Sequence, residues 1–256
     1  MITTKHLFPF NNNEDYENAK NAGLINKPSV SFIKDSKKCK YSSKKEIIKP
    51  DTDPFNGYEY IDLGLPSGTL WAKCNIGGNS ESDYGLYFAW GEVEGYSSDD
   101  VRNGIRQFKD GSDYKFGVDD NPYEFTKYNG DDSLTTLLPE DDAASVNMGG
   151  SWHMPSKEQL DELINSSYTT TSWTTVNGIN GRLITSKTNN NTLFLPASGY
   201  CNWGSVYYIG SYGYYWSSSL HEFNPGSAWY LRFYSGSINV GYDYRGYGRT
   251  VRGVIG

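Results

Sequence analysis

The sequence contains few of the residues from which catalytic and metal centres are built. Among its 256 residues are 3 cysteines and 3 histidines. Cys39, Cys74 and Cys201 are far apart and show neither a Cys-x-x-Cys spacing nor a Cys/His pattern typical of zinc sites. Their odd number also argues against a disulfide framework, so we expect free thiols in a protein made in a reducing cytoplasm.

Long apolar runs are absent as well. No stretch approaches the roughly 18 consecutive apolar residues that a transmembrane helix requires. The opening MITTKHLFPFNNNEDYENAK has no apolar core of the kind found in secretory signal peptides. We therefore expect neither membrane insertion nor export by the secretory route.

Motifs for hydrolytic chemistry and for metal binding are also lacking. A serine hydrolase would need a nucleophile elbow near a histidine and an acid, and none surrounds His6, His153 or His221. The acidic pairs could ligate calcium, but they lack the alternating spacing of an EF-hand, so solvated loops are the favoured interpretation. These pairs are Asp119-Asp120, Asp131-Asp132 and Asp141-Asp142. Nothing marks two carboxylates as a glycosidase pair. We expect a protein that is not an enzyme and that needs no cofactor.

Charge is distributed unevenly along the chain. Residues 1–50 carry a net charge of +5, whereas residues 51–256 carry −12. Such a contrast indicates that the two parts meet different partners. The acidic larger part would repel phosphates, which argues against a nucleic-acid partner.

Aromatic residues and glycine are abundant, at 16% and 28 residues, which is typical of a turn-rich β-containing protein. Of the chain's 22 tyrosines, 11 lie between Tyr200 and Tyr247, separated mostly by Gly, Ser and Asn. This mixture resembles an evolved binding surface, where rings supply rigid contact area and small polar residues adapt. A tyrosine-rich β-sheet is the alternative for any single residue. A single core, however, cannot provide partners for so many phenol hydroxyls.

We therefore expect part of this cluster to form an exposed ligand-binding face. The predicted contacts are Asn202, Trp203, Tyr207, Tyr208, Tyr212, Tyr242, Tyr244 and Tyr247. Four further residues of the same stretch are expected to belong to the scaffold, namely Trp216, Trp229, Phe233 and Arg252.

The chain divides into three predicted parts. Residues 1–43 form a small N-terminal module, a short helix followed by a hairpin, that is too small to fold alone and should attach to a partner or to copies of itself. Residues 44–57 form a proline-containing linker. Residues 58–256 form the main domain.

Within the main domain, patterning predicts several elements. Residues 58–77 give two short strands, and residues 97–133 a long insertion loop with little regular structure. One helix is expected to begin at Pro139, and a second follows the capping box of Ser156 and Gln159. Strands separated by Asn-Gly and Asn-rich turns follow. Trp90 and Trp152 are expected to be buried.

Seven motifs of residues 58–256 occur in the order expected of a known family. They are EYIDLGLPSGTLWAKCNIG, YGLYFAWGE, EDDAASVNMGGSWHMPSKEQLDEL, NGINGRLITSK, LFLPASGY, YGYYWSSS and RTVRGV. The segment resembles the Fibrobacter succinogenes major paralogous domain, which is similar in fold to C-type lectins and to the formylglycine-generating enzyme.

The resemblance implies an α+β, C-type lectin-like domain with a twisted antiparallel sheet and two helices. His153 departs from the family, which has Arg after the preceding Trp. The cysteine pair of formylglycine-generating enzymes has no counterpart here, because Cys74 and Cys201 lie in different motifs. The Glu-Pro-Asn, Gln-Pro-Asp and Trp-Asn-Asp motifs of calcium-dependent lectins are absent.

The N-terminal part contains NAGLINKPSVSFIKDSKK, followed by a lysine-rich strand. This segment resembles the attachment segments of fibre and virion proteins from tailed, crAss-like phages of gut Bacteroidales. This resemblance implies a non-enzymatic virion protein, a head or tail fibre, made in the host cytoplasm. Residues 1–50 would bind other virion proteins and assemble the chain, with a trimer favoured. The main domain would bind a host-surface glycan or protein. A bacterial cell-surface adhesin and a purely structural capsid decoration are the alternatives.

Overall fold

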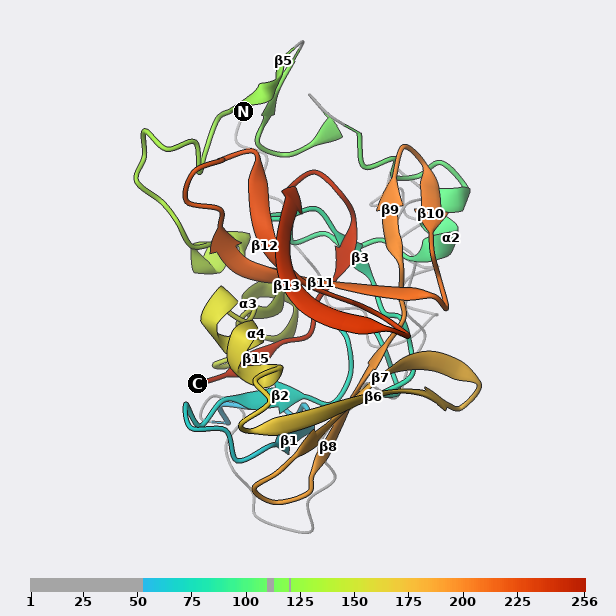
Figure 1. Ribbon diagram of the computed structural model, residues 1–256. Coiled ribbons are helices and arrows are strands. Elements are labelled where there is room, and N and C mark those ends of the chain that lie inside the picture. Colours follow the sequence, from blue (N-terminus) through green and yellow to red (C-terminus); the bar gives the residue numbers. More distant parts are fainter. Residues whose placement is uncertain (1–52, 110–112, 120) are drawn as a thin grey trace, which may run out of the picture. The chain divides into compact units, whose positions relative to one another are not determined.

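The computed structural model describes residues 53–109, 113–119 and 121–256, apart from the side chains of Pro122 and Tyr123. The predicted N-terminal module and most of the predicted linker lie outside these residues. The described part is an α+β domain, rich in strands and poor in helix (Figure 1). None of its helices is long and apolar enough to cross a membrane.

The largest sheet has the strand order β13-β12-β11-β14-β3. Strand β11 pairs antiparallel with β12 and β12 with β13, while β14 runs parallel to β11 and antiparallel to β3. The bounds are β3 Tyr87–Phe88, β11 Tyr212–Leu220, β12 Ser227–Tyr234, β13 Ser237–Tyr244 and β14 Arg249–Thr250. We call it the central sheet, since it carries the candidate site.

Four smaller sheets complete the strand content of the described residues. Their strands are β1 Tyr60–Asp62, β2 Leu70–Ala72 and β15 Val254–Ile255; β6 Thr169–Val176, β7 Ile179–Ser186 and β8 Thr192–Pro196; β9 Tyr200–Asn202 and β10 Ser205–Tyr207; β4 Gly117–Val118 and β5 Asn121–Phe125. The predicted Asn-Gly turn between β6 and β7 is confirmed. Both Asn177 and Gly178 have positive φ, at 51° and 81°, as a two-residue hairpin of type I′ requires.

The predicted capping box is confirmed in α4, Lys157–Leu163, where the Ser156 and Gln159 side chains each bond the other's backbone N–H. This helix lies against β11, β12 and β13. The helix expected from Pro139 begins later. Pro139–Asp141 form a 3-10 turn, and α3, Ala143–Met148, follows it because the Asp142 carboxylate accepts the N–H groups of Ala144 and Ser145 as N-cap.

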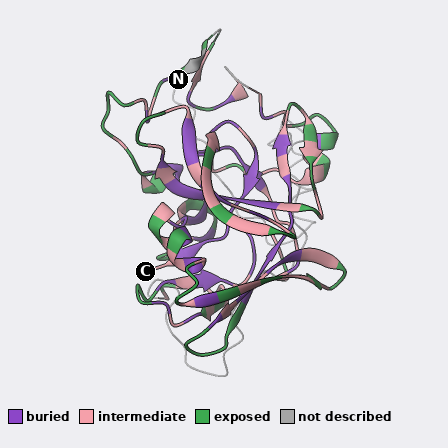
Figure 2. Ribbon diagram, viewed as in Figure 1, coloured by how far each residue is buried: buried purple, intermediate pink, exposed green. Residues whose placement is uncertain are grey.

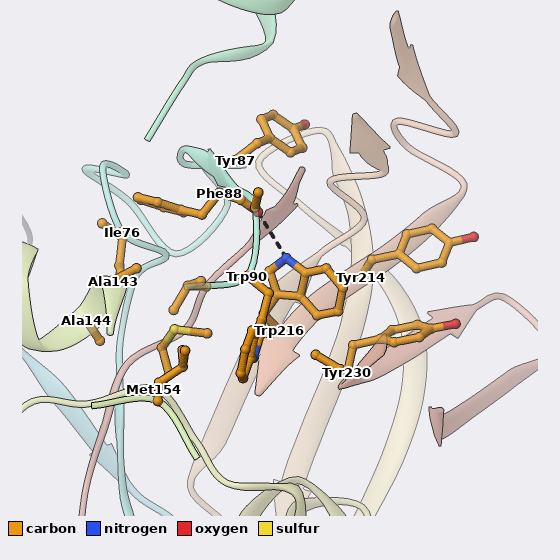
Figure 3. Close-up of a cluster of buried hydrophobic side chains, with 14 of the residues drawn as sticks. Ile76, Tyr87, Phe88, Trp90, Ala143, Ala144, Met154, Tyr214, Trp216 and Tyr230 are labelled. Carbon is orange, nitrogen blue, oxygen red and sulfur yellow. Dashed lines mark hydrogen bonds between the residues drawn. The ribbon is translucent and has the colours of Figure 1, made fainter. Parts of the chain in front are cut away.

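Alternating residues of the central sheet contribute their side chains to two hydrophobic clusters, one on each face of the sheet. Leu231 and Phe233 belong to the cluster that also contains Leu160 and Leu163 of α4. Trp216 belongs to the other cluster, where its Nε1 donates to the backbone oxygen of Phe88 at 2.9 Å (Figure 3). Trp90 and Trp152 are buried in that cluster, as predicted. Figure 2 colours most of β11 and β12 as buried and β13 as intermediate or exposed.

The segment 97–133 has more order than the long insertion loop with little regular structure that its polar composition predicts. It contains α2, Ser98–Arg102, as well as β4 and β5. Its aromatic residues Phe108, Tyr114, Phe116, Phe125 and Tyr128 are buried in the same cluster as Trp216. Several of them surround the guanidinium of Arg245, which lies 3.7 Å from the Phe125 ring centroid. The prediction was wrong because these rings follow no strand or helix period. Their burial depends on packing around Arg245, which is distant in the sequence.

Two smaller expectations also change. The described end of the predicted linker packs on the domain, because Ser151 and Trp152 donate to the backbone oxygens of Pro54 and Phe55 at 2.9 and 2.8 Å. The cysteines differ from each other. The Cys74 side chain is disulfide-bonded, which corrects the expectation that Cys74 is a free thiol. Cys201 is a buried free thiol, and burial raises its pKa above the usual value.

Candidate functional site: a tyrosine groove on the central sheet

One face of the central sheet carries an uninterrupted row of aromatic and charged side chains. Because side chains alternate along a strand, every second residue of YGYYW in β11 and YLRFY in β12 shares this face. The register places Tyr214 opposite Arg232 and Trp216 opposite Tyr230. Figure 3 shows the Tyr214 and Tyr230 hydroxyls pointing away from Trp216, so the two rings continue the core outward.

A hollow of about 250 Å³ opens over these strands. We call it the tyrosine groove. It is lined by Tyr200, Tyr208, Tyr212, Tyr214, Tyr230, Arg232, Asp243 and Arg249. The rings touch one another: Tyr200 lies 5.3 Å from Tyr214, and Tyr208 lies 5.1 Å from Tyr212, between centroids. Such distances are typical of favourable aromatic pairs, so the wall of the groove is one connected ring surface.

Arg249 forms the floor of the groove. From β14 its side chain reaches across β11 and β12, and its guanidinium stacks 3.7 Å from the Tyr230 ring centroid. Its Nη2 donates to Oδ2 of Asp243 on β13 at 2.6 Å. Arg249 is 1% exposed, yet its Nε and Nη1 have no hydrogen-bond partner within the described residues.

The hydroxyl groups of the groove differ from those of the core. In the core, Tyr87 donates to Ser198 O at 2.6 Å, and Tyr215 donates to Pro196 O at 2.8 Å. None of the five tyrosines that line the groove forms a hydroxyl hydrogen bond with the described part of the chain. Polar groups that converge without protein partners are available to a ligand.

Two phenols of the groove, those of Tyr200 and Tyr214, stay protonated at neutral pH. Burial raises the pKa of Tyr214 to about 12, although Arg232 and Arg249 oppose the shift. Burial, with smaller effects from Tyr247 and Tyr208, also raises the pKa of Tyr200. Tyr200 and Tyr214 therefore offer the groove neutral hydroxyls that both donate and accept hydrogen bonds.

The hairpin β9–β10 supplies one wall of the groove and carries an exposed aromatic tip. Tyr200 and Tyr207 are paired across it and stack at 5.3 Å. At its tip Trp203 is 59% exposed and has φ of 47°, and just beyond β10 Tyr208 has φ of 59°. Bulky residues adopt left-handed backbone at a cost of about 1–3 kcal/mol each, and such strain concentrates at functional sites.

All eight predicted contact residues lie at least partly at the surface. Tyr207, Tyr208 and Tyr212 come together around Tyr200. Tyr247 joins them through its own contact with Tyr200 at 5.6 Å, and Tyr244 packs on Tyr247 at 5.5 Å. Asn202 and Trp203 lie at the turn of the hairpin, where the ammonium of Lys109 is 5.4 Å from the Trp203 ring.

Tyr242 is separated from the other predicted contacts. It lies opposite Trp229 in the register, on the face of the central sheet that packs on α4. There its ring contacts His221 at 3.9 Å and Trp229 at 5.3 Å. Trp229, expected to be scaffold, is only partly buried, because it sits where this face reaches the surface. The other three scaffold residues are buried, as predicted: Trp216, Phe233 and Arg252.

The pair Asp141-Asp142 does not lie in a solvated loop. Both residues are 3% exposed. Lys115 and Lys127 each reach Asp141 at 2.5 Å, and Asp142 caps α3. Their oxygens are therefore already engaged. In the part of the chain that the structure describes, no group of three or more His, Cys, Asp or Glu is placed to hold a metal ion.

A second hollow of about 650 Å³ is a weaker candidate. Its lining includes Lys73, but the Nζ of this lysine is already paired with Glu59 at 2.6 Å. Asn191, also in the lining, donates to the backbone oxygen of Asp62 at 2.7 Å. Because Lys73 and Asn191 are engaged within the fold and Tyr60 is the aromatic ring that lines this hollow, we favour the tyrosine groove as the site.

Reasoning from the sequence missed most of the groove floor. The missed lining residues are Tyr200, Tyr214, Tyr230, Arg232, Asp243 and Arg249. Alternation in YGYYW and YLRFY did group some of them on one face. The alternation does not predict which face of the sheet is open to solvent, because the open face is determined by where α4 packs.

Comparison with known proteins covers this same region. Residues 173–254 match the family described as Domain of unknown function (DUF8237). The match extends from β6 to β15 and includes every residue that lines the tyrosine groove. No curated protein and no solved structure matches the chain.

Proposed function

We propose that this chain is a non-enzymatic virion protein of a bacteriophage, a head or tail fibre. In this proposal the main domain is C-type lectin-like, and it binds a host-surface glycan or protein through the tyrosine groove. The observation that carries the binding role is an aromatic hollow lined by two arginines and by five tyrosines whose hydroxyls form no hydrogen bond with any described residue. Rings and arginines are the side chains that dominate binding energy at recognition surfaces.

The chemistry of the groove supports binding rather than catalysis. Asp243 is the carboxylate among its lining residues, and its pairing with Arg249 at 2.6 Å opposes its use as a general base. His221 lies with Trp229 and Tyr242 on the opposite face of the sheet. The disulfide at Cys74 is of a kind that persists at virion and cell surfaces.

The virion assignment rests on the resemblance of the N-terminal segment and on its charge, +5 over residues 1–50. In this proposal these residues attach the chain to other virion proteins and assemble it as a homo-oligomer, with a trimer favoured. Light scattering on the full chain tests the assembly. A monomer would contradict it.

Binding is tested with two tyrosines of equal exposure on opposite faces of one sheet. Tyr208, in the groove, is 55% exposed, and Tyr242, outside it, is 53% exposed. Full-length protein, Tyr208→Ala and Tyr242→Ala are labelled and applied to a panel of Bacteroidales cells and a glycan array. We expect Tyr208→Ala to lose about tenfold or more in affinity, since a ring at a recognition hot spot contributes over 1 kcal/mol, while Tyr242→Ala binds like the parent.

Equal loss for both variants would contradict the assignment of the groove. No binding by the parent protein would favour the structural capsid decoration. Binding together with a particle-free, cell-surface location of the native protein would favour the bacterial adhesin.

A further inference from the structure

The charges of the tyrosine groove do not balance. Asp243 neutralises Arg249, which leaves Arg232 as an excess positive charge. Residues 51–256 carry a net charge of −12. The excess positive charge of the groove is therefore opposite in sign to the net charge of the domain. An unmatched charge inside an aromatic site calls for a partner of opposite sign.

Arg232 has rings for neighbours in place of acceptors. Its guanidinium carbon lies 5.4 Å from the Tyr212 ring centroid and 5.9 Å from that of Tyr234. It forms no hydrogen bond or ion pair with any described residue, and its Nε is buried without a partner. The rings hold the flat guanidinium in place, while its donors remain free for a planar acceptor.

Arg249, which also lines the groove, has buried donors without a partner among the described residues. Its Nε and Nη1 are buried and unpartnered, and the side chain is 1% exposed. Another buried arginine, Arg252, shows what the fold does when an arginine is purely structural. Arg252 donates to Asn75 and to three backbone oxygens, and none of its nitrogens is left buried without a partner.

We propose that the tyrosine groove binds a sugar residue that carries a carboxylate, a uronic or sialic acid type of unit, with the carboxylate held by Arg232. The inference rests on the proposed binding function and names its ligand class. A guanidinium fork matches the two oxygens of a carboxylate. Tyrosine rings pack on the apolar face of a sugar, and their unpartnered hydroxyls match its hydroxyl groups.

The size and charge of the groove favour one acidic sugar over larger anions. Its volume of about 250 Å³ is below the roughly 300–1,000 Å³ of sites for drug-sized ligands, and suits a single ring. A nucleic acid or another polyanion would meet the repulsion of the acidic domain around the groove. A flexible acidic peptide would present one carboxylate but no ring to stack on the tyrosines.

The test uses two ligand pairs in which a neutral group replaces the carboxylate, a hydroxymethyl group in one pair and a methyl ester in the other. Full-length protein is titrated by NMR and calorimetry to millimolar concentrations with methyl β-D-glucuronide against methyl β-D-glucoside. The second pair is the methyl glycoside of N-acetylneuraminic acid against its methyl ester. We expect at least one acid to bind about 10- to 100-fold more tightly than its neutral partner, as a charge-assisted bidentate contact implies.

Arg232→Met should abolish that difference, because methionine keeps an apolar stem without the charge. Arg102→Met is the control, since Arg102 is an exposed arginine paired with Asp99 at 3.1 Å on α2. Tryptophan fluorescence shows whether each variant is folded. Equal affinity for both members of both pairs, no effect of Arg232→Met, or equal binding of a glutamate-rich peptide would overturn the inference.

The proposed function can fail separately. If cells bind through Tyr208 while neither acid is preferred, the ligand class is wrong and the binding role stands. If an acidic sugar binds the groove but cells do not, the cellular role is wrong.

Discussion

The two faces of the central sheet use the same residue types for different purposes. Tyr215 and Tyr214 are neighbours on β11 and therefore point to opposite faces. Tyr215 is buried against α4 and its neighbours, where its hydroxyl donates to Pro196 O and accepts from Asn75. Tyr214 opens into the groove with a hydroxyl that meets no described protein group.

The arginines repeat the contrast. Arg252 is buried among acceptors, and this burial lowers its pKa to about 10. Arg232 has rings around it and free donors. Among the described residues, three buried donors without a hydrogen-bond partner lie at the groove, the Nε of Arg232 and the Nε and Nη1 of Arg249, and others lie elsewhere, at Trp71, Arg106 and Arg245. Since unsatisfied buried donors destabilise a fold, three of them at one hollow indicate a role other than stability there.

The largest effect should separate the two arginines. Arg252→Met leaves Asn75 and several backbone oxygens without a donor, and we expect a loss of about 3 kcal/mol or more in the free energy of unfolding. Arg232→Met removes no protein hydrogen bond and should change it by less than about 1 kcal/mol. Urea denaturation followed by tryptophan fluorescence measures both. Similar losses of unfolding free energy in the two variants would contradict the distinction between a structural Arg252 and a ligand-binding Arg232.

A smaller effect should separate the two tyrosines. Tyr215→Phe strips Pro196 O of its donor and should cost about 1–2 kcal/mol. Tyr214→Phe should leave the free energy of unfolding within about 0.5 kcal/mol of the parent, because no protein group loses a partner. The same denaturation series checks this. A cost at Tyr214 that equals the cost at Tyr215 would show that the groove hydroxyl has a structural partner after all.

The smallest effect should have the opposite sign. Trp203→Asn creates an Asn-Gly turn at a position with φ of 47°, which suits asparagine far better than tryptophan. We expect the free energy of unfolding to rise by about 0.5–1 kcal/mol, the relief of a strained backbone.

Trp203→Ala is the matched control, since alanine removes the ring without relieving the strain, and it should bring no gain. If Trp203→Asn is stabilised and still binds cells like the parent, the prediction that Trp203 is a ligand contact is wrong. The proposed binding role of the groove is then unaffected.

Local signals along the chain predicted much of the framework. The capping box at Ser156, the hairpin turn at Asn177 and the burial of Trp90 depend on neighbours in the sequence or on residue type, and all three are confirmed. The segment 97–133 was predicted wrongly, because its rings are collected by Arg245, more than a hundred residues away. Asp141 was misread for the same reason, since its partners Lys115 and Lys127 belong to that segment.

By itself the sequence determined that this chain has an aromatic, glycine-rich, acidic domain with more tyrosine hydroxyls than one core can satisfy. Only the tertiary structure decided which of them are satisfied. Strand register and the packing of α4 assign each ring to one of two faces, and a shift of one residue would exchange the faces. The groove therefore depends on long-range packing, which brings Arg249 and Asp243 to opposite sides of β12 and leaves Arg232 between rings, with no ion pair to any described residue.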